Sequence, residues 1–363
     1  MRGIFVGGAK TMKKGVIFLS AALSLSFLAG CAGTPVVYCP GCNCPQNGAA
    51  VDSTTPGYIA DGAVKTGLAI VGSVSDSENA VAAAYDVTMV GVTVDRNGVI
   101  QSCRIDGMKT NVAFDNTGMI TSDVNASILT KNELGEHYGM KAYGGAKYEW
   151  NEQAAALARY AEGKTVEELK SGAIDESGKA PQGSDLASTA TIYLGGYVSA
   201  IEKAVANAQY LGAQVGDELR LASVHAVDSS KNAIGGEDGV AQLDCDVTVL
   251  TVKEDTITSC VIDSVQAKVN FDQTGTITTD VSVPMQTKDE LGESYGMKAY
   301  GGAKYEWNEQ AASFAGYVTG KTVQEVAEIS VDERTAPAGV DLSSSVTIAI
   351  GGFQNLIIKA MQG

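Results

Sequence analysis

The sequence has few of the residues that enzymes commonly use for acid-base catalysis and metal binding. Histidine occurs only twice, as His137 and His225. The chain carries an internal repeat, described below, and Ser294 stands at the position that matches His137 in the second copy. Neither histidine therefore belongs to a site shared by both copies, and no metal site is predicted.

Common catalytic motifs are also missing. The chain has no Gly-x-Ser-x-Gly nucleophile elbow, no P-loop and no dinucleotide-binding fingerprint. Carboxylates do recur at matching positions, Asp106 with Asp263 and Glu149 with Glu306, but nothing pairs them as acid and base. We interpret them as solvated charges or helix caps. The residue types therefore offer few options for a catalytic site.

Basic residues are scarce. The chain has 26 lysines and arginines against 42 aspartates and glutamates, which gives a net charge of −16 at pH 7. Such a surface repels nucleic acid and anionic lipid headgroups, so no nucleic-acid partner is expected. Attachment to a membrane must therefore come from something other than the protein surface.

The first 30 residues are typical of a lipoprotein signal peptide. Lys13 and Lys14 precede an apolar run over residues 16–28, which is too short to span a membrane comfortably. The run ends in Leu-Ala-Gly-Cys, which resembles a bacterial lipobox whose cysteine, here Cys31, carries a lipid. This predicts a protein anchored by its lipid to the outer face of the cytoplasmic membrane. The alternative is a plain secretory signal with a chance cysteine at this position.

A flexible tether is predicted over residues 31–58, which are rich in Pro, Gly and Asn. Its remaining cysteines favour a local disulfide over a metal site, because no histidine is near to complete a ligand set: Cys39, Cys42 and Cys44. Cys103 and Cys260 occupy matching positions in strand-like runs and are expected to be buried. Cys245 has no counterpart in the first copy.

The chain contains the same unit twice. Residues 138–155 read YGMKAYGGAKYEWNEQAA, and residues 295–312 are identical. The spacing of about 157 residues is far longer than that of a solenoid repeat, so each copy is expected to be a complete domain with its own core. We place the first domain at residues 59–208 and the second at residues 209–363.

Each copy reads as strands followed by helices. Asn-Gly within residues 95–98 predicts a hairpin, and a second hairpin is expected around residues 114–118 and their match at 271–275. An alanine-rich helix is predicted over residues 150–160, and capping boxes at Thr165 and Thr322 predict further helices. The predicted fold class is α+β, in two homologous tandem domains of antiparallel strands followed by helices.

Seven residues that occur twice are the candidate for the chemistry of the chain. Residues 185–191 read Asp-Leu-Ala-Ser-Thr-Ala-Thr, residues 341–347 read Asp-Leu-Ser-Ser-Ser-Val-Thr, and an apolar helix is predicted after each. These stretches resemble the Asp-x-x-Ser/Thr-Gly-Ala-Thr motif of the FMN-binding domain family. In that family a flavin transferase joins the last threonine, through its oxygen, to the phosphate of FMN.

The resemblance implies covalent FMN, as phosphoesters, at Thr191 and Thr347. The other positions that match the motif are Asp185, Ser188, Ala190, Asp341 and Ser344. A lipobox, a tether and two such modules together resemble the FMN-carrying lipoproteins that serve extracellular electron transfer in Gram-positive bacteria. The implied partners are a flavin transferase and a membrane-bound electron donor, with extracellular acceptors.

The residues make such an attachment chemically reasonable. A threonine hydroxyl is a poor nucleophile without a base, so an outside enzyme must install the flavin. Small neighbours keep the hydroxyl accessible, and we expect the N-terminus of the following helix to offer free N–H groups to the phosphate.

Two departures from the motif leave an alternative open. The glycine of the family is Thr189 in one copy and Ser345 in the other, and Val346 replaces the usual alanine. If that glycine serves a positive φ or the close approach of the transferase, these residues impede attachment. The alternative is a surface binding or structural module that keeps the fold without the flavin.

The identical segment offers aromatic rings at matching positions. They could stack on the flavin ring or, alternatively, cover the hinge between the strands and the helices. The residues concerned are Tyr143, Tyr148 and Trp150, with Tyr300, Tyr305 and Trp307 in the second copy.

Overall fold

The computed structural model describes residues 60–77 and 80–362. The signal peptide over residues 1–30, the lipid attachment site Cys31 and the tether over residues 31–58 lie outside the described residues, as do Cys39, Cys42 and Cys44.

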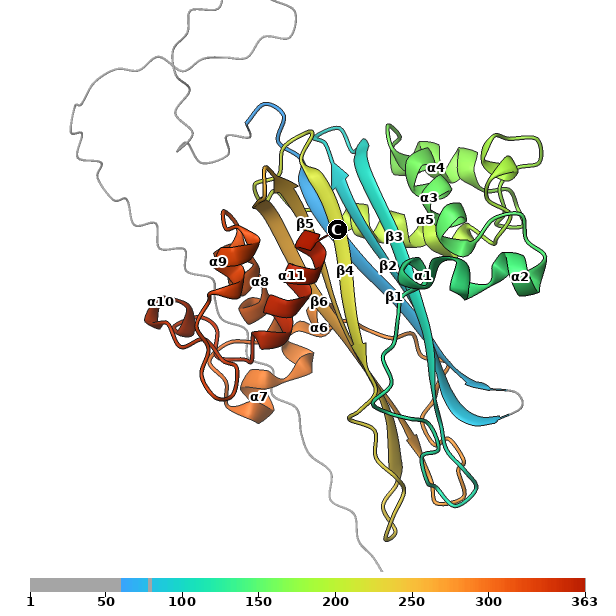
Figure 1. Ribbon diagram of the computed structural model, residues 1–363, viewed down its shortest axis with the longest axis vertical. Coiled ribbons are helices and arrows are strands. Elements are labelled where there is room, and N and C mark those ends of the chain that lie inside the picture. Colours follow the sequence, from blue (N-terminus) through green and yellow to red (C-terminus); the bar gives the residue numbers. More distant parts are fainter. Residues whose placement is uncertain (1–59, 78–79, 363) are drawn as a thin grey trace, which may run out of the picture. The chain divides into compact units, whose positions relative to one another are not determined.

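The described chain is α+β, as predicted, and runs through strands and then helices twice (Figure 1). The first series is β1 (Lys65–Ser77), β2 (Ala80–Val94), β3 (Ile100–Ala113), α1 (Lys131–Leu134), α2 (Met140–Gly144), α3 (Trp150–Ala161), α4 (Val166–Ala173) and α5 (Gly195–Ala206). The second is β4 (Glu218–Ala226), β5 (Gly239–Lys253), β6 (Thr256–Phe271), α6 (Lys288–Leu291), α7 (Met297–Gly301), α8 (Trp307–Val318), α9 (Val323–Ala327), α10 (Val340–Ser343) and α11 (Gly351–Gln362). Short 3-10 turns η1 (Gly135–Tyr138), η2 (Leu186–Ser188) and η3 (Gly292–Tyr295) lie between them.

The strands form two antiparallel sheets of three, in the orders β1-β2-β3 and β4-β5-β6. The predicted hairpin at residues 95–98 is confirmed, because the Asp95 N–H donates to the Val99 carbonyl at 3.0 Å and Gly98 has φ 80°. The second predicted hairpin is only a tight turn. Gly118 takes the expected positive φ of 74°, but pairing stops at one bridge between Phe114 and Ile120.

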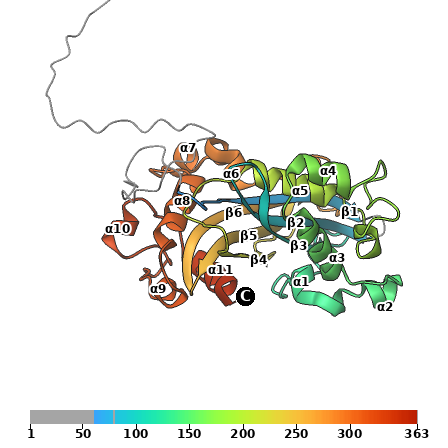
Figure 2. The same cartoon turned by 90° about the horizontal axis from the view of Figure 1, so that it is seen from above.

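Strand alternation sends side chains to two sides of each sheet. On β2, Val90, Val92 and Val94 pack against α3 and α5, whereas Val87 and Met89 face the other sheet. Figures 1 and 2 show the helices of the first series beside one sheet and those of the second series beside the other. The described residues therefore form helix, sheet, sheet and helix layers.

The buried side chains gather in three clusters. One lies between the first sheet and its helices, one between the second sheet and its helices, and one between the two sheets. In the middle cluster Phe114 stacks on Phe271 with ring centroids 3.8 Å apart. The described residues all belong to one compact unit, so the division into two tandem domains stays a prediction.

The predicted helices at residues 150–160 and after the capping boxes are confirmed. Thr165 and Thr322 each accept a hydrogen bond from the third helical N–H, and a glutamate side chain completes each box. Cys103 and Cys260 are buried as expected, and so is Cys245; all three are free thiols. Among residues 60–77 and 80–362, no helix is both long and apolar enough to cross a membrane.

Candidate functional site

The seven-residue stretch of the first half is a surface loop held by apolar anchors. Leu186 and Ala190 are buried, at 3% and 1% exposure, while Asp185, Ser188 and Thr191 are exposed. The Ser188 hydroxyl donates to the Asp185 carbonyl at 2.6 Å and closes the 3-10 turn η2. The loop therefore presents its last threonine to solvent in a defined conformation.

Thr191 is fixed from beneath by a buried glutamine on α3. Gln153 Oε1 accepts from the Thr191 N–H at 2.8 Å, from the Ile192 N–H at 3.1 Å and from the Thr191 hydroxyl at 3.3 Å. Gln153 Nε2 donates to the Tyr148 carbonyl at 2.9 Å. One side chain thus joins the seven-residue stretch to the segment that is identical in both halves.

The second half repeats this arrangement. Gln310 Oε1 accepts from the Thr347 N–H at 2.8 Å, the Ile348 N–H at 3.2 Å and the Thr347 hydroxyl at 3.1 Å. The Ser344 hydroxyl closes its turn on the carbonyl of Asp341 at 2.8 Å. All three of the motif positions matched in this half, Asp341, Ser344 and Thr347, are exposed.

The backbone at the position of the missing glycine is ordinary. Thr189 has φ −121°, and Ser345 is not among the described residues with positive φ. The neighbouring Val346 is fully buried, as Ala190 is in the first half. Neither half therefore needs glycine here for its conformation.

The helices begin later than the motif ends, which changes one expectation. The helix α5 starts at Gly195, and the N–H groups of Leu194 and Gly195 both donate to the carbonyl of Gly178, at 2.7 and 3.0 Å. The N–H groups of Thr191 and Ile192 are taken by Gln153. The expectation of free N–H groups at the N-terminus of the following helix is therefore wrong at Gly195, its first residue.

The six predicted aromatic residues divide by exposure, with Tyr148 and Tyr305 partly buried. Tyr143 and Tyr300 are 91% and 90% exposed, on the short helices α2 and α7. Trp150 and Trp307 are buried in the cores beneath the helices, at 3% and 5%. Of the six, Tyr143 and Tyr300 are the most exposed to solvent.

The shared carboxylates serve as caps. Glu149 is buried and accepts from the N–H groups of Met140 and Lys141, at 2.8 and 3.0 Å, at the start of α2. Asp263 is 8% exposed and accepts from the N–H groups of Ser264 and Asp289. The interpretation as caps is confirmed, but Glu149 and Asp263 are not solvated.

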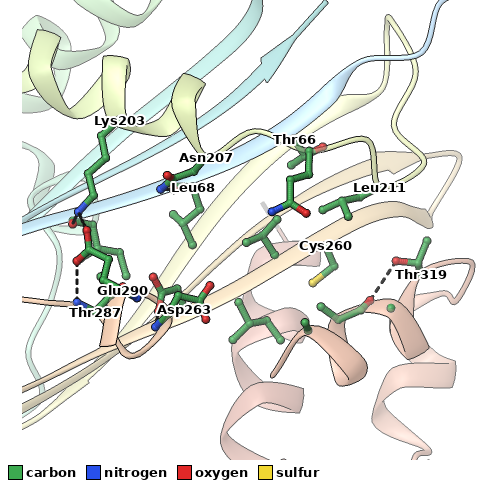
Figure 3. Close-up of a pocket in the computed structure, with 18 residues that line it drawn as sticks. Thr66, Leu68, Lys203, Asn207, Leu211, Cys260, Asp263, Thr287, Glu290 and Thr319 are labelled. Carbon is green, nitrogen blue, oxygen red and sulfur yellow. Dashed lines mark hydrogen bonds and ion pairs between the residues drawn. The ribbon is translucent and has the colours of Figure 1, made fainter. Parts of the chain in front are cut away.

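A cavity of about 440 Å³ between β1, α5, β6, α6 and α8 is a second candidate site (Figure 3). Leu68, Ile70 and Cys260 contribute apolar walls, and an ion pair between Lys203 Nζ and Glu290 Oε1, at 2.6 Å, crosses from one half to the other. Its volume is that of small-molecule sites. Asp289 lines the cavity and is exposed as a residue, but partial desolvation of its carboxyl and the nearby carboxylates of Asp263 and Glu290 raise its pKa to about 7.

A matching cavity, also of about 440 Å³, lies between β3, α1, β4 and α11. Its ion pair joins Lys359 Nζ to Glu133 Oε1, again at 2.6 Å and again between the halves. Asn132 stands where the first cavity has Asp289. In the part of the chain that the structure covers, no group of three or more His, Cys, Asp or Glu residues is placed to hold a metal ion.

Sequence reasoning missed Gln153 and Gln310, although a signal was present. On α3 the residues Trp150, Gln153, Ala154 and Leu157 share the buried face, so a glutamine lies in an otherwise apolar stripe. The same glutamine recurs in the second half. A polar residue on a buried helix face needs a partner, and here the partner is the threonine loop.

Comparison with protein-family models, with curated proteins and with solved structures found no match to this chain.

Proposed function

We propose that this chain is a lipid-anchored flavoprotein at the outer face of the cytoplasmic membrane, which relays electrons through FMN joined to Thr191 and Thr347 by phosphoesters. The observation that carries the proposal is the paired setting of these threonines. Each ends a stretch that resembles the flavin attachment motif, is exposed, and has its hydroxyl bonded to a buried glutamine.

The local residues fit a phosphoester at these hydroxyls. Covalent attachment requires an accessible oxygen, and both threonines are exposed beside other small hydroxyl residues. The backbone at Thr189 and Ser345 takes no positive φ, so the missing glycine does not strain the loop. Tyr143 and Tyr300 are the most exposed of the six aromatic residues predicted to stack on a flavin.

FMN supplies the redox chemistry when bound, and the chain supplies attachment and position. Electrons would come from a membrane-bound donor and pass to extracellular acceptors. The lipid at Cys31 would keep the protein near the donor, since the net charge of −16 disfavours direct binding to anionic headgroups. A covalent link suits this location, because a dissociated cofactor would diffuse away.

The second candidate is a surface binding or structural module that keeps the fold and carries no flavin. The replacement of the motif glycine by Thr189 and Ser345 favours it, because a side chain there can obstruct a transferase even where the backbone is relaxed.

The intact mass of the mature protein distinguishes the two. After co-expression with a flavin transferase, we expect a gain of two FMN groups less two waters. The variants Thr191→Val and Thr347→Val should each lose one of them, and Thr189→Val, which removes a neighbouring hydroxyl, should keep both. Finding both threonines unmodified in protein from its native host would refute the proposal and favour the module without flavin.

A further inference from the structure

The buried glutamines bond the threonine hydroxyls as well as the backbone N–H groups of the loops. Gln153 and Gln310 are both 0% exposed, and a buried amide is unfavourable unless its polar atoms are bonded. Each satisfies its oxygen with the threonine and the residue that follows it. We propose that Gln153 and Gln310 are positioning residues that hold the acceptor threonines for a flavin transferase. This assignment rests on the proposed function.

The hydrogen bond sets the direction of the hydroxyl. A threonine hydroxyl has one proton and two lone pairs. Thr191 directs that proton inward, to Gln153 Oε1 at 3.3 Å, while the residue itself is exposed. Together with the two N–H bonds to the same oxygen, this bond holds the threonine of an exposed loop in one conformation, where a transferase can bring its substrate.

The glutamine is itself held rigidly. It projects from the 12-residue helix α3, and its Nε2 donates to the Tyr148 carbonyl at 2.9 Å. In the second half Gln310 Nε2 donates to the Tyr305 carbonyl at 3.0 Å. The threonine is thus positioned by the core rather than by its own loop, which favours reaction by reducing the freedom of the acceptor.

Gln153 takes no chemical part in the attachment step. The bond that forms joins Thr191 Oγ1 to the phosphorus of the flavin phosphate. As the transferase binds, the hydroxyl turns its proton away from Gln153 Oε1 to a base of the transferase, which takes the proton, while the N–H groups of Thr191 and Ile192 stay bonded to Gln153. The bond that breaks is the phosphoanhydride of a flavin dinucleotide, with the nucleoside monophosphate as leaving group. No electrons are transferred, and Gln153 neither takes the proton nor contacts phosphorus.

Loss of the glutamine should slow modification without unfolding the loop. In Gln153→Met, an unbranched apolar replacement, water can hydrate the N–H of the exposed Thr191. The hydroxyl then samples all three staggered rotamers and loses one hydrogen bond, which predicts a rate of attachment about threefold to tenfold lower.

The two halves of one chain give a matched control. Full-length Gln153→Met and Gln310→Met proteins would each be incubated with a flavin transferase and a flavin dinucleotide, and the peptides carrying Thr191 and Thr347 quantified by mass over time. We expect Gln153→Met to slow only Thr191 and Gln310→Met to slow only Thr347. The kcat of the transferase should fall at the affected threonine while its KM stays unchanged.

A conservative variant separates positioning from stability. In Gln153→Glu, burial keeps the carboxyl protonated, so one oxygen still accepts from Thr191 and the O–H replaces the amide as donor to the Tyr148 carbonyl. At least half of the wild-type rate at Thr191 should therefore return. Wild-type rates at Thr191 in Gln153→Met, or a rise in KM with kcat unchanged, would overturn the assignment. Wild-type protein without flavin on either threonine would instead refute the proposed function, and the assignment with it.

Discussion

The core shared by the two sheets predicts that both halves unfold together. Phe114 from the first half and Phe271 from the second are 3% and 0% exposed, and their rings stack at 3.8 Å. Truncation of a buried phenylalanine to alanine costs about 3–5 kcal/mol. At roughly 2–4 °C per kcal/mol, Phe114→Ala should lower the Tm by about 10 °C.

The chain provides a natural probe for each half. Its two tryptophans are Trp150, in the core beneath the first helices, and Trp307, in the core beneath the second. In Trp307→Phe and Trp150→Phe backgrounds, the fluorescence of the remaining tryptophan reports the unfolding of one half in urea. We expect the two transitions to have the same midpoint, and Phe114→Ala to lower both equally.

Two independent domains would behave differently. Phe114→Ala would then shift the transition seen by Trp150 and leave that of Trp307 unchanged, and this result would refute the shared core as the source of cooperativity. Phe114→Ala combined with Phe271→Ala should show a coupling of about 0.5–1.5 kcal/mol, as expected for an aromatic pair. Tyr143→Ala, at a position 91% exposed, is the control and should change the free energy of unfolding by less than about 0.5 kcal/mol.

Three further predictions concern packing, pH and thiol reactivity. Gly67→Ala places a methyl group against the backbone of α5 and should destabilise by about 1–3 kcal/mol in urea unfolding, whereas Gly144→Ala, with open space around it, should not. The pKa of Asp289 is raised to about 7, so the folded state holds a proton that the unfolded chain releases near pH 3.8. The free energy of unfolding should therefore fall as the pH rises from about 3.8 to about 7. Asp289→Asn should remove that fall and stabilise the protein above pH 7. The gain should be no more than about 1 kcal/mol, because the residue is exposed and its charge is screened by solvent. Asn132→Asp should introduce a similar fall, and urea unfolding at a series of pH values measures both. Burial raises the pKa values of the three described thiols, so alkylation followed by peptide mass analysis at pH 8 should label them only after unfolding: Cys103, Cys245 and Cys260.

Local sequence patterns predicted the elements of the fold well. Capping boxes at Thr165 and Thr322 mark helix starts because the bonds involved span only three residues. The turn at Gly118 was also predicted, since it needs only a positive φ. The strand expected after it is a single bridge between Phe114 and Ile120, and the Ile120 N–H donates to the side chain of Asn232.

Contacts between the halves could not be read from the repeat. A repeat of complete units predicts a core in each, and nothing in the pattern of one unit says that Phe114 will stack on its own counterpart Phe271. The apolar inner faces of β2 and β5 look the same in sequence whether they meet a helix or another sheet.

In the candidate site, too, the local motif could be predicted from the sequence, whereas the contacts with distant residues could not. The motif located Thr191 and Thr347, and the structure adds what holds them, which lies on a helix some 38 residues earlier in the chain. Gln153 was missed because the helical periodicity places it on the buried face of α3. The sequence does not say which distant residue a buried polar side chain contacts. Gln310 makes the same three hydrogen bonds in the second half. A buried glutamine that served only to stabilise its own helix would not need a threonine at the matching position of both halves, so the repeated contact links the glutamine to the threonine.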